Sequence, residues 1–278
     1  MTDPSQPLFL FGPGYSAQAL AALWRGPVLG TYRSDERREM LEQSGILPVS
    51  VDDEADLRKA MDAAHVVISA PPSEDGCPGF ARLAGFADTA TSLTYLSTTG
   101  TYGDLNGGWA MEWSRPNPQS DRAQRRLAAE RAWQGKSDNL RIVRLPGIYG
   151  PGRSAFDRLA SGRARRIVKD GQVFSRAHVD DIASGLDALI QSGARGVFNL
   201  CDDLAAPPED VISFAAALAG IDPPPAVRFE DAELSVMGRS FYSECKRVSN
   251  ARLKAVTGWR PRYPTYRDGL SAIFAAAG

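Results

Sequence analysis

The sequence predicts an α/β protein with a doubly wound parallel sheet and a smaller C-terminal lobe. Two observations support this fold class. Short, mainly apolar runs alternate with helix-like segments from residue 8 to about residue 145, and the runs show no regular alternation of apolar and polar residues. Such strands are buried on both faces, as in parallel sheets that helices cover on both sides. Right-handed crossovers between them then wind the sheet in both directions.

The alternation begins with a strand at Leu8–Phe11 and a helix rich in alanine and leucine at Tyr15–Trp24. The next helix, Ser34–Gln43, starts with a capping serine and two acidic residues, which suit the positive end of a helix dipole. The other strands are expected at Pro27–Tyr32, Leu47–Val51, His65–Ser69, Leu93–Ser97 and Arg141–Arg144. The other helices are expected at Glu54–Ala63, Phe80–Thr91 and Ser120–Trp133.

The alternation becomes less regular after about residue 150. A helix at Val179–Ile190, a strand at Val197–Leu200 and a helix at Pro208–Leu218 are still expected, and three consecutive prolines at 223–225 indicate turns. We therefore expect residues 1–150 to form the main sheet domain. Residues 151–278 are expected to contribute partly to that sheet and mainly to a small substrate lobe.

The composition limits the classes of partner. A formal net charge of -1 gives no field that would steer the chain to nucleic acid or anionic lipid, and no apolar run approaches the ~20 residues of a membrane span. Residues 1–7 lack the basic residues of a secretory leader. Three widely spaced cysteines fit a reducing compartment, so we expect a cytoplasmic protein. The two histidines are not at metal-ligand spacing, so no metal site is expected.

Residues 12–17 (GPGYSA) follow the first strand and open the first helix. This is the pattern G-x-G-x-x-A, in which Gly12 permits the tight turn and Gly14 lets a pyrophosphate approach the backbone. Ala17 supplies the small third residue that helix–strand packing needs. The free N–H groups at the start of the helix then bind the phosphates. At this place in a βαβ pattern, the motif predicts a Rossmann domain that binds a dinucleotide.

The end of the second strand indicates which dinucleotide is bound. An Asp or Glu there accepts the ribose 2′-OH of NAD. Here Tyr32 is followed by Arg33 and Ser34, and a carboxylate first appears at Asp35. A guanidinium suits a 2′-phosphate, so we predict NADP bound by Arg33 and Ser34 with help from Arg37. The alternative is NAD, with Asp35 on the ribose.

Four further motifs follow in order, at residues 96–103 (LSTTGTYG), 145–153 (LPGIYGPGR), 178–183 (HVDDIA) and 246–254 (KRVSNARLK). Together with the glycine loop they resemble the extended short-chain dehydrogenase/reductases, the family of NAD-dependent epimerases and dehydratases that act on nucleotide sugars and related compounds. The resemblance covers nearly the whole chain. It implies an oxidoreductase or epimerase for a small polar or sugar-like substrate. Members often form homodimers through the fourth and fifth helices; here one is fairly apolar and the other charged, which leaves the oligomeric state open.

The resemblance also implies a Ser or Thr after the fifth strand and a Tyr-x-x-x-Lys pair on the next helix. Thr98 matches the first position. Counting back from Glu130, which matches a common family glutamate, the Tyr position is Arg122 and the Lys position is Arg126. Arginine stays protonated at neutral pH, so Arg122 cannot be the acid/base. Arg126 can still bond the nicotinamide ribose; the alternative is an i,i+4 pair with Glu130 on a solvated face.

Two tyrosines are candidates for the missing proton donor. The resemblance places Tyr102 and Tyr149 near the carboxyl ends of strands, where ligands bind, although both fit packing roles equally well. His178 titrates near neutrality, but the resemblance implies a structural segment in which Asp180 and Asp181 bond the backbone. The expected catalytic set is Thr98, Tyr102, Tyr149 and Arg126. The dinucleotide is further expected to contact Tyr15, Ser16, Ser50, Val51, Ala70, Pro71, Arg126 and Pro146.

The sequence leaves the function open between two main interpretations. In the first, the chain is an atypical NADP-dependent oxidoreductase or epimerase, whose second lobe offers Arg239, Phe241, Tyr242 and Lys246 as candidate substrate contacts. In the second, it is a non-catalytic redox or ligand sensor that kept the dinucleotide site and lost the Tyr-Lys pair. A structural subunit with a vestigial site is a third interpretation. Thr98, Tyr149 and the second lobe favour the enzyme.

Overall fold

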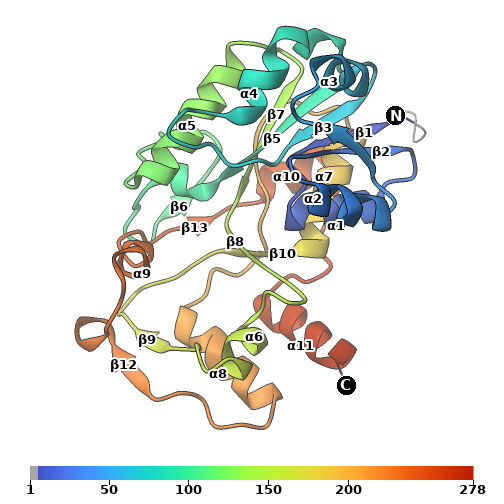
Figure 1. Ribbon diagram of the computed structural model, residues 1–278. Coiled ribbons are helices and arrows are strands. Elements are labelled where there is room, and N and C mark those ends of the chain that lie inside the picture. Colours follow the sequence, from blue (N-terminus) through green and yellow to red (C-terminus); the bar gives the residue numbers. More distant parts are fainter. Residues whose placement is uncertain (1–5, 278) are drawn as a thin grey trace.

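A computed structural model describes residues 6–277 (Figure 1). Its centre is a seven-stranded sheet in the order β11-β7-β5-β4-β1-β2-β3, and every neighbouring pair is parallel. The strands are β1 Leu8–Phe11, β2 Val28–Tyr32, β3 Leu47–Ser50, β4 His65–Ile68, β5 Ser92–Thr98, β7 Leu140–Leu145 and β11 Gly196–Asn199. The predicted doubly wound parallel sheet is confirmed, with its first strand at the switch point between the two halves.

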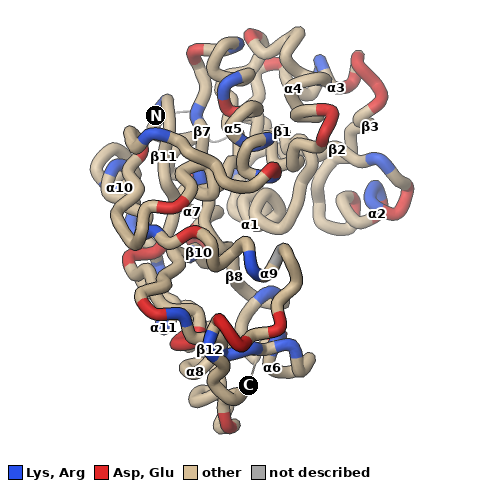
Figure 2. The backbone as a smooth tube through the Cα atoms, turned by 90° about the vertical axis from the view of Figure 1, so that its left-hand side faces the viewer, with Lys and Arg blue, Asp and Glu red and all other residues tan. Residues whose placement is uncertain are grey.

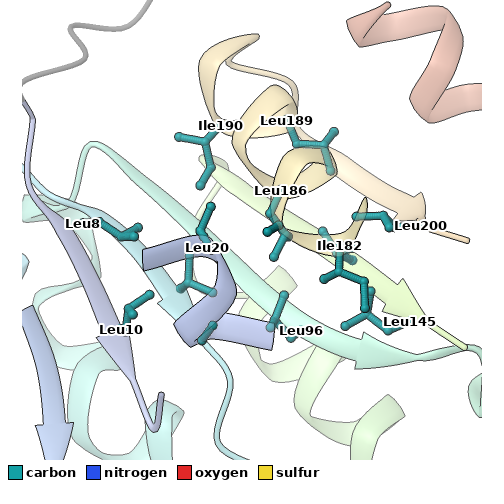
Figure 3. Close-up of a cluster of buried hydrophobic side chains, with 14 of the residues drawn as sticks. Leu8, Leu10, Leu20, Leu96, Leu145, Ile182, Leu186, Leu189, Ile190 and Leu200 are labelled. Atoms are coloured by element: carbon teal, nitrogen blue, oxygen red, sulfur yellow. The ribbon is translucent and has the colours of Figure 1, made fainter. Parts of the chain in front are cut away.

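Helices cover both faces of the sheet, and β1 shows why its residues are all apolar. Leu8 and Leu10 enter one core, together with α1 (Tyr15–Leu23) and α7 (Val179–Gln191), as Figure 3 shows. Phe9 and Phe11 enter the opposite core. The helices that complete these two layers are α2 Asp35–Gln43, α3 Glu54–Met61, α4 Pro78–Leu83, the 3₁₀ turn η1 Ala84–Thr89, α5 Asp121–Gln134 and α10 Ala251–Thr257.

One predicted element is wrong in kind. The single helix expected at Phe80–Thr91 is α4 followed by η1, with a break at Phe86, whose φ is −133°. Gly85, just before the break, lowers helix stability by about 1 kcal/mol relative to alanine, and the Phe86 ring is buried in the core. Tertiary packing therefore outweighs helical continuity. The other predicted elements begin and end within two residues of the observed bounds.

The second lobe begins where the chain leaves the sheet after β7 (Figure 1). Strand β8 (Gly147–Tyr149) pairs in parallel with β10 (Arg176–His178), and this two-stranded link connects the lobe to the sheet domain. The lobe core packs α6 (Ala155–Ala160), α8 (Pro208–Leu218) and α11 (Tyr266–Ala277) around buried Ile212. The remaining elements are β6 Trp109–Ala110, β9 Arg166–Val168, β12 Ala226–Arg228, β13 Arg247–Val248, η2 Thr99–Tyr102, η3 Phe229–Asp231 and α9 Val236–Phe241.

Charges of both signs are interspersed along the backbone (Figure 2). This distribution accords with the small net charge of the sequence. Among residues 6–277, no helix has the length and apolar character that crossing a bilayer requires.

Candidate functional site

Gly12 holds the glycine loop in a shape that no other residue could adopt without strain. Its φ is +69°, and an added Cβ would lie 2.6 Å from the Cβ of Ala70. Its N–H donates to Oγ1 of Thr31 at 2.8 Å. The loop is thereby fixed between β1, β2 and the end of β4. Ala70, expected to contact the dinucleotide, packs against this loop.

Gly14 differs, because the protein itself does not require a glycine there. Its φ is −94°, and an added Cβ would meet only the Ser69 hydroxyl, at 3.8 Å. It is the N-cap of α1, makes no side-chain cap, and has no acidic residue in the following turn. The N–H groups at the start of α1 therefore have no side-chain cap as acceptor, as a phosphate site requires. Ala17 is fully buried, in the core beneath α1.

Three residues at and after the end of β2 lie beside this loop. Arg33 is exposed and, within the described part of the chain, makes no hydrogen bond or ion pair. Ser34 caps α2 by accepting from the N–H of Arg37 at 3.3 Å, and the Arg37 guanidinium donates to the Pro13 carbonyl of the glycine loop. Arg33 also lines a cavity of about 430 Å³ together with Val51, Asp52, Pro78, Ala81 and Arg82.

This cavity lies where the carboxyl end of β3 meets α4. Val51 is buried, so it offers the cavity mainly backbone, and Ser50 just before it is half-buried. The outer wall is an ion pair, Arg82 to Asp52 at 2.8 Å. Neither Asp52 nor Arg82 was in the predicted set; the position of Asp52 directly after Ser50 and Val51 was the available signal. Pro71 is exposed just after β4.

Thr98 ends β5 and caps the turn η2. Its Oγ1 accepts from the N–H of Gly100 at 3.1 Å, which leaves the hydroxyl proton able to donate to a ligand. Pro146 follows β7, the neighbour of β5, and is half-buried. The next residue, Gly147, is exposed, and an added Cβ would meet only atoms at 3.6 Å or more. The turn after β7 is therefore open to solvent beside Thr98.

Helix α5 carries arginines at the two positions where the family resemblance implies a Tyr-Lys pair. Arg126 is half-buried, donates to the Leu96 carbonyl of β5, and lies 5.8 Å from the centre of the Tyr95 ring. Arg122 is exposed. The alternative pair of Arg126 with Glu130 is wrong. Glu130 is buried and binds Arg144 instead, through contacts of 3.1 and 2.6 Å, because Arg144 on β7 needs a counter-charge inside the core.

The structure does not place Tyr102 as a proton donor. Its side chain is fully buried, and its hydroxyl donates to Oδ1 of Asn199 at 2.7 Å. The Arg144 guanidinium lies 4.6 Å from its ring centre. Burial is the main cause that raises the pKa of Tyr102, so the phenol holds its proton more tightly. We therefore remove Tyr102 from the catalytic set; its ring packs against Arg144 and its hydroxyl bonds Asn199.

Tyr149 is also a packing residue. A Cβ at Gly269 would lie 2.1 Å from its hydroxyl oxygen, so Tyr149 fills the space that this glycine of α11 leaves. Burial, followed by the charges of Asp202 and Asp181, raises its pKa. Its ring meets the edge of His178 at 5.2 Å. The hydroxyl points into the junction of the two lobes and away from solvent, so we remove Tyr149 from the catalytic set too.

The segment at 178–183 fixes the start of α7. His178 is the N-cap, and its Nδ1 accepts from the N–H of Asp180 at 3.2 Å. Asp181 accepts from the N–H groups of Arg262 at 2.6 Å and Tyr263 at 3.1 Å. Asp181 thus has the backbone-bonding role expected for this segment.

Of the second-lobe candidates, three already have partners within the protein. Arg239 stacks on Phe229 at 5.5 Å, and the Tyr242 ring lies between Phe174 and Phe229. Lys246 is buried and donates to the Gly103 carbonyl at 2.7 Å. Phe241 is 59% exposed and remains available to a ligand.

Sequence reasoning missed one connection across the lobes. The hydroxyl of Tyr15, in the glycine loop, donates to the Pro151 carbonyl at 2.9 Å. Arg153, which is exposed, lies 5.8 Å from the Tyr15 ring centre. The position of Arg153 in the motif at 145–153 was the signal. Tyr15 therefore joins the predicted phosphate site to the second lobe.

Buried Asp202, at the junction of the two lobes, makes the free energy of unfolding depend on pH. Burial raises its pKa to about 8, although the Arg176 charge lowers it in part. The folded state then binds a proton that the unfolded state releases near pH 3.8, so this contribution to the free energy of unfolding falls as the pH rises towards 8. Burial raises the pKa of Asp181 to about 6, so Asp181 acts in the same direction as Asp202 but only up to about pH 6. Burial lowers the pKa of His65 to about 4, so His65 acts in the opposite direction, between pH 4 and 6.5.

Between pH 6.5 and 8, Asp202 is therefore the group of these three that still titrates. We expect the free energy of unfolding to fall by about 2 kcal/mol over this interval, at 1.36 kcal/mol per pH unit. Asp202→Asn, which mimics the protonated acid, should abolish the fall, while Asp203→Asn at the exposed neighbour should keep it. Urea unfolding at both pH values measures this. A wild-type stability that is flat over the interval would contradict the assignment.

Comparison with known proteins places this geometry in context. No family model matches the chain. A conserved protein of unknown function from Silicibacter pomeroyi DSS is 42% identical, with 98% of this chain and 99% of that chain covered and a TM-score of 0.90. The two chains belong to one family.

More distant structures identify the fold. UDP-glucuronic acid 4-epimerase from Bacillus cereus, in complex with NAD, is 18% identical with a TM-score of 0.76, covering 97% of this chain and 96% of that one. The dTDP-glucose 4,6-dehydratase from Bacillus anthracis, also with NAD, is 15% identical with a TM-score of 0.76 and the same coverage. This chain therefore has the fold of these NAD-bound epimerases and dehydratases. The expected resemblance to the epimerase/dehydratase type is confirmed at that level.

One curated relative of this chain has a name that states an activity. The 3-diazoavenalumate denitrifying reductase of a Streptomyces species is 29% identical over 140 residues. The match spans 46% of this chain and 45% of that reductase. The chain thus corresponds to less than half the length of the relative.

Proposed function

We propose that this chain binds NADP(H) and is an NADPH-dependent oxidoreductase. The observation that carries the proposal is the open phosphate cradle at Gly14. The fold needs a glycine at Gly12, but at Gly14 a side chain would meet nothing closer than 3.8 Å. A position that the protein could fill, at a helix start with free N–H groups, suits a ligand that approaches the backbone. A nicotinamide dinucleotide fits this cradle, and two structures with the same fold were solved in complex with NAD.

The residues around the end of β2 support NADP over NAD. Arg33 is free of partners within residues 6–277, and Arg37 is held beside the glycine loop through Pro13. Ser34 has its hydroxyl at the start of α2. Two guanidinium groups and a hydroxyl suit a 2′-phosphate, whereas a ribose 2′-OH is bound by a carboxylate acceptor. Asp35 is the nearest carboxylate and is exposed in the first turn of α2.

We expect the protein to bind NADPH more tightly than NADH. Arg33→Ala should lower the NADPH affinity about 10- to 100-fold, because charge-assisted bonds contribute roughly 1.5–3 kcal/mol, and should leave the NADH affinity within about twofold. Fluorescence titration of the reduced nicotinamide measures both. Arg38→Ala is the matched control, since Arg38 lies on α2, the helix that follows Arg33, and pairs with Glu42 at 3.1 Å. Tighter NADH binding by the wild type would overturn the NADP assignment.

The remaining site residues support reduction of a bound substrate. NADPH, when bound, supplies a hydride. The Thr98 hydroxyl would donate a hydrogen bond to the reacting oxygen, and Arg126, anchored to the Leu96 carbonyl, would bond the nicotinamide ribose. The Streptomyces relative is a reductase, which favours reduction over epimerisation here.

A sensor is the second candidate function. The observation that favours it is the pair of arginines at 122 and 126, together with the buried hydroxyls of Tyr102 and Tyr149. A sensor would bind NADPH tightly and leave every substrate of a broad carbonyl and sugar-nucleotide panel unchanged at 340 nm. Turnover of any panel member at a rate that depends on Thr98 would exclude it.

A further inference from the structure

Arg122 and Arg126 lie on one face of α5, because residues four apart on a helix are neighbours. Arg126 contacts the Leu96 carbonyl of β5. Helix α5 joins the parallel strands β5 and β7, so it runs opposite to them. One helical turn towards its N-terminus, about 5.4 Å, therefore corresponds to roughly two residues further along β5, which is Thr98.

A second contact supports this register. A Cβ at Gly100 would lie 3.5 Å from the Cβ of Ala123 and 3.5 Å from the side chain of Thr98. The first turn of α5, which contains Arg122, thus packs beside the Thr98 turn. Arg122 is exposed and, among residues 6–277, has no hydrogen bond or ion pair. Its guanidinium is therefore free to bind a ligand at Thr98.

The groups at this place donate hydrogen bonds and do not release protons. A threonine hydroxyl and a guanidinium both keep their protons at neutral pH. The hydroxyls of Tyr102 and Tyr149 are buried, and the pKa of each is raised by burial. A donor-only site of this kind stabilises an oxyanion as it forms and has no acid to neutralise it.

We propose, on the basis of the NADPH-dependent function above, that the substrate is an α,β-unsaturated carbonyl compound and that Arg122 binds the oxyanion made from it. The hydride forms a bond to the β-carbon. The π electrons of the C=C bond then form a new double bond between the α-carbon and the carbonyl carbon, and the π electrons of the C=O bond move onto oxygen. The product is an enolate, which takes one proton from water, and the dinucleotide leaves oxidised. A saturated ketone would instead leave an alkoxide, which requires an acid at the moment of transfer.

Stability of the oxyanion is what separates these substrates. A phenol, whose anion is conjugated like an enolate, ionises with a pKa of about 10, whereas water, which models an unconjugated alkoxide, is a much weaker acid. Hydrogen bonds from Arg122 and Thr98 suffice for a conjugated anion. We therefore expect turnover of 2-cyclohexenone with NADPH to exceed that of cyclohexanone, its saturated counterpart, at least tenfold.

Two arginine variants test whether Arg122 binds the oxyanion. Arg122→Leu should lower kcat for 2-cyclohexenone on the order of 10²-fold, as loss of one oxyanion donor does, with NADPH affinity unchanged. Arg131→Leu, an exposed arginine of the same helix two turns further on, should change neither value. Equal rates for the two substrates, or an unchanged kcat in Arg122→Leu, would overturn the proposal.

A second test, which needs no turnover, uses 4-nitrophenol, whose conjugated phenolate absorbs at roughly 400 nm. The wild type, titrated with and without NADP⁺, should bind the phenolate about tenfold more tightly than the phenol, and Arg122→Leu should lose this preference while Arg131→Leu keeps it. Absence of any preference in the wild type overturns the proposal even if neither cyclic substrate is reduced. Failure of NADPH to bind overturns the proposed function separately, because it is measured in its own titration.

Discussion

Gly14→Val is expected to abolish tight dinucleotide binding while the protein stays folded. The backbone of Gly14 is extended, with φ −94° and ψ −166°, and a valine can adopt it. Its branched side chain would fill the space in front of the α1 N-terminus and keep a pyrophosphate from the N–H groups. We expect at least a 100-fold loss in NADPH affinity, about 2.7 kcal/mol, and a change in stability within about 1 kcal/mol.

Gly12→Ala gives the opposite pattern and serves as the comparison. A left-handed φ costs an alanine about 1–2 kcal/mol, and its Cβ would press on Ala70 at 2.6 Å. We expect a loss of about 3 kcal/mol in the free energy of unfolding. Fluorescence titration and urea unfolding of both variants separate the two roles. A Gly14→Val protein that binds NADPH normally would show that the open cradle is not the phosphate site.

The parallel sheet could be predicted because its strands are mainly apolar without a regular alternation of polar residues, and burial on two faces is the physical reason. In β1, Leu8 and Leu10 face one core while Phe9 and Phe11 face the other. The break at Phe86 could not be predicted, since it reflects the packing of one ring against the core instead of a strong local signal. A sequence window records propensity and shows little of the partners that override it.

The site residues could likewise be predicted where their partners are close in the sequence, and could not where the partners are distant. The glycine loop and the residues after β2 are close in the sequence, so their motif was enough to bring them together. The role of Tyr102 depends on Asn199, which lies 97 residues away and is brought near by β11 at the edge of the sheet. Tyr149 is covered by Gly269 from the last helix. No spacing in the sequence reports such contacts, and both hydroxyls therefore had to be removed from the catalytic set.

Glu130→Gln is expected to cost about 3–5 kcal/mol of folding stability, a large share of the roughly 5–15 kcal/mol of a typical protein. Glu130 and Arg144 are 1% and 4% exposed and are joined by two hydrogen bonds; Glu130 also accepts from the Ser97 hydroxyl. Removal of the carboxylate would leave the Arg144 guanidinium as a buried charge without a counter-ion. Urea unfolding at neutral pH measures the loss.

The double variant Glu130→Leu/Arg144→Met shows whether the loss comes from the stranded charge. Replacement of a buried ion pair by apolar side chains of similar volume is often neutral, because two desolvation costs disappear with the attraction. We expect it to recover most of the stability lost in Glu130→Gln. If the double variant is as unstable as the single one, packing of α5 against β5 and β7, and not charge, explains the effect. Since Arg122 and Arg126 lie on the same helix, a recovered double variant that also binds NADPH would show that the ion pair serves the fold alone.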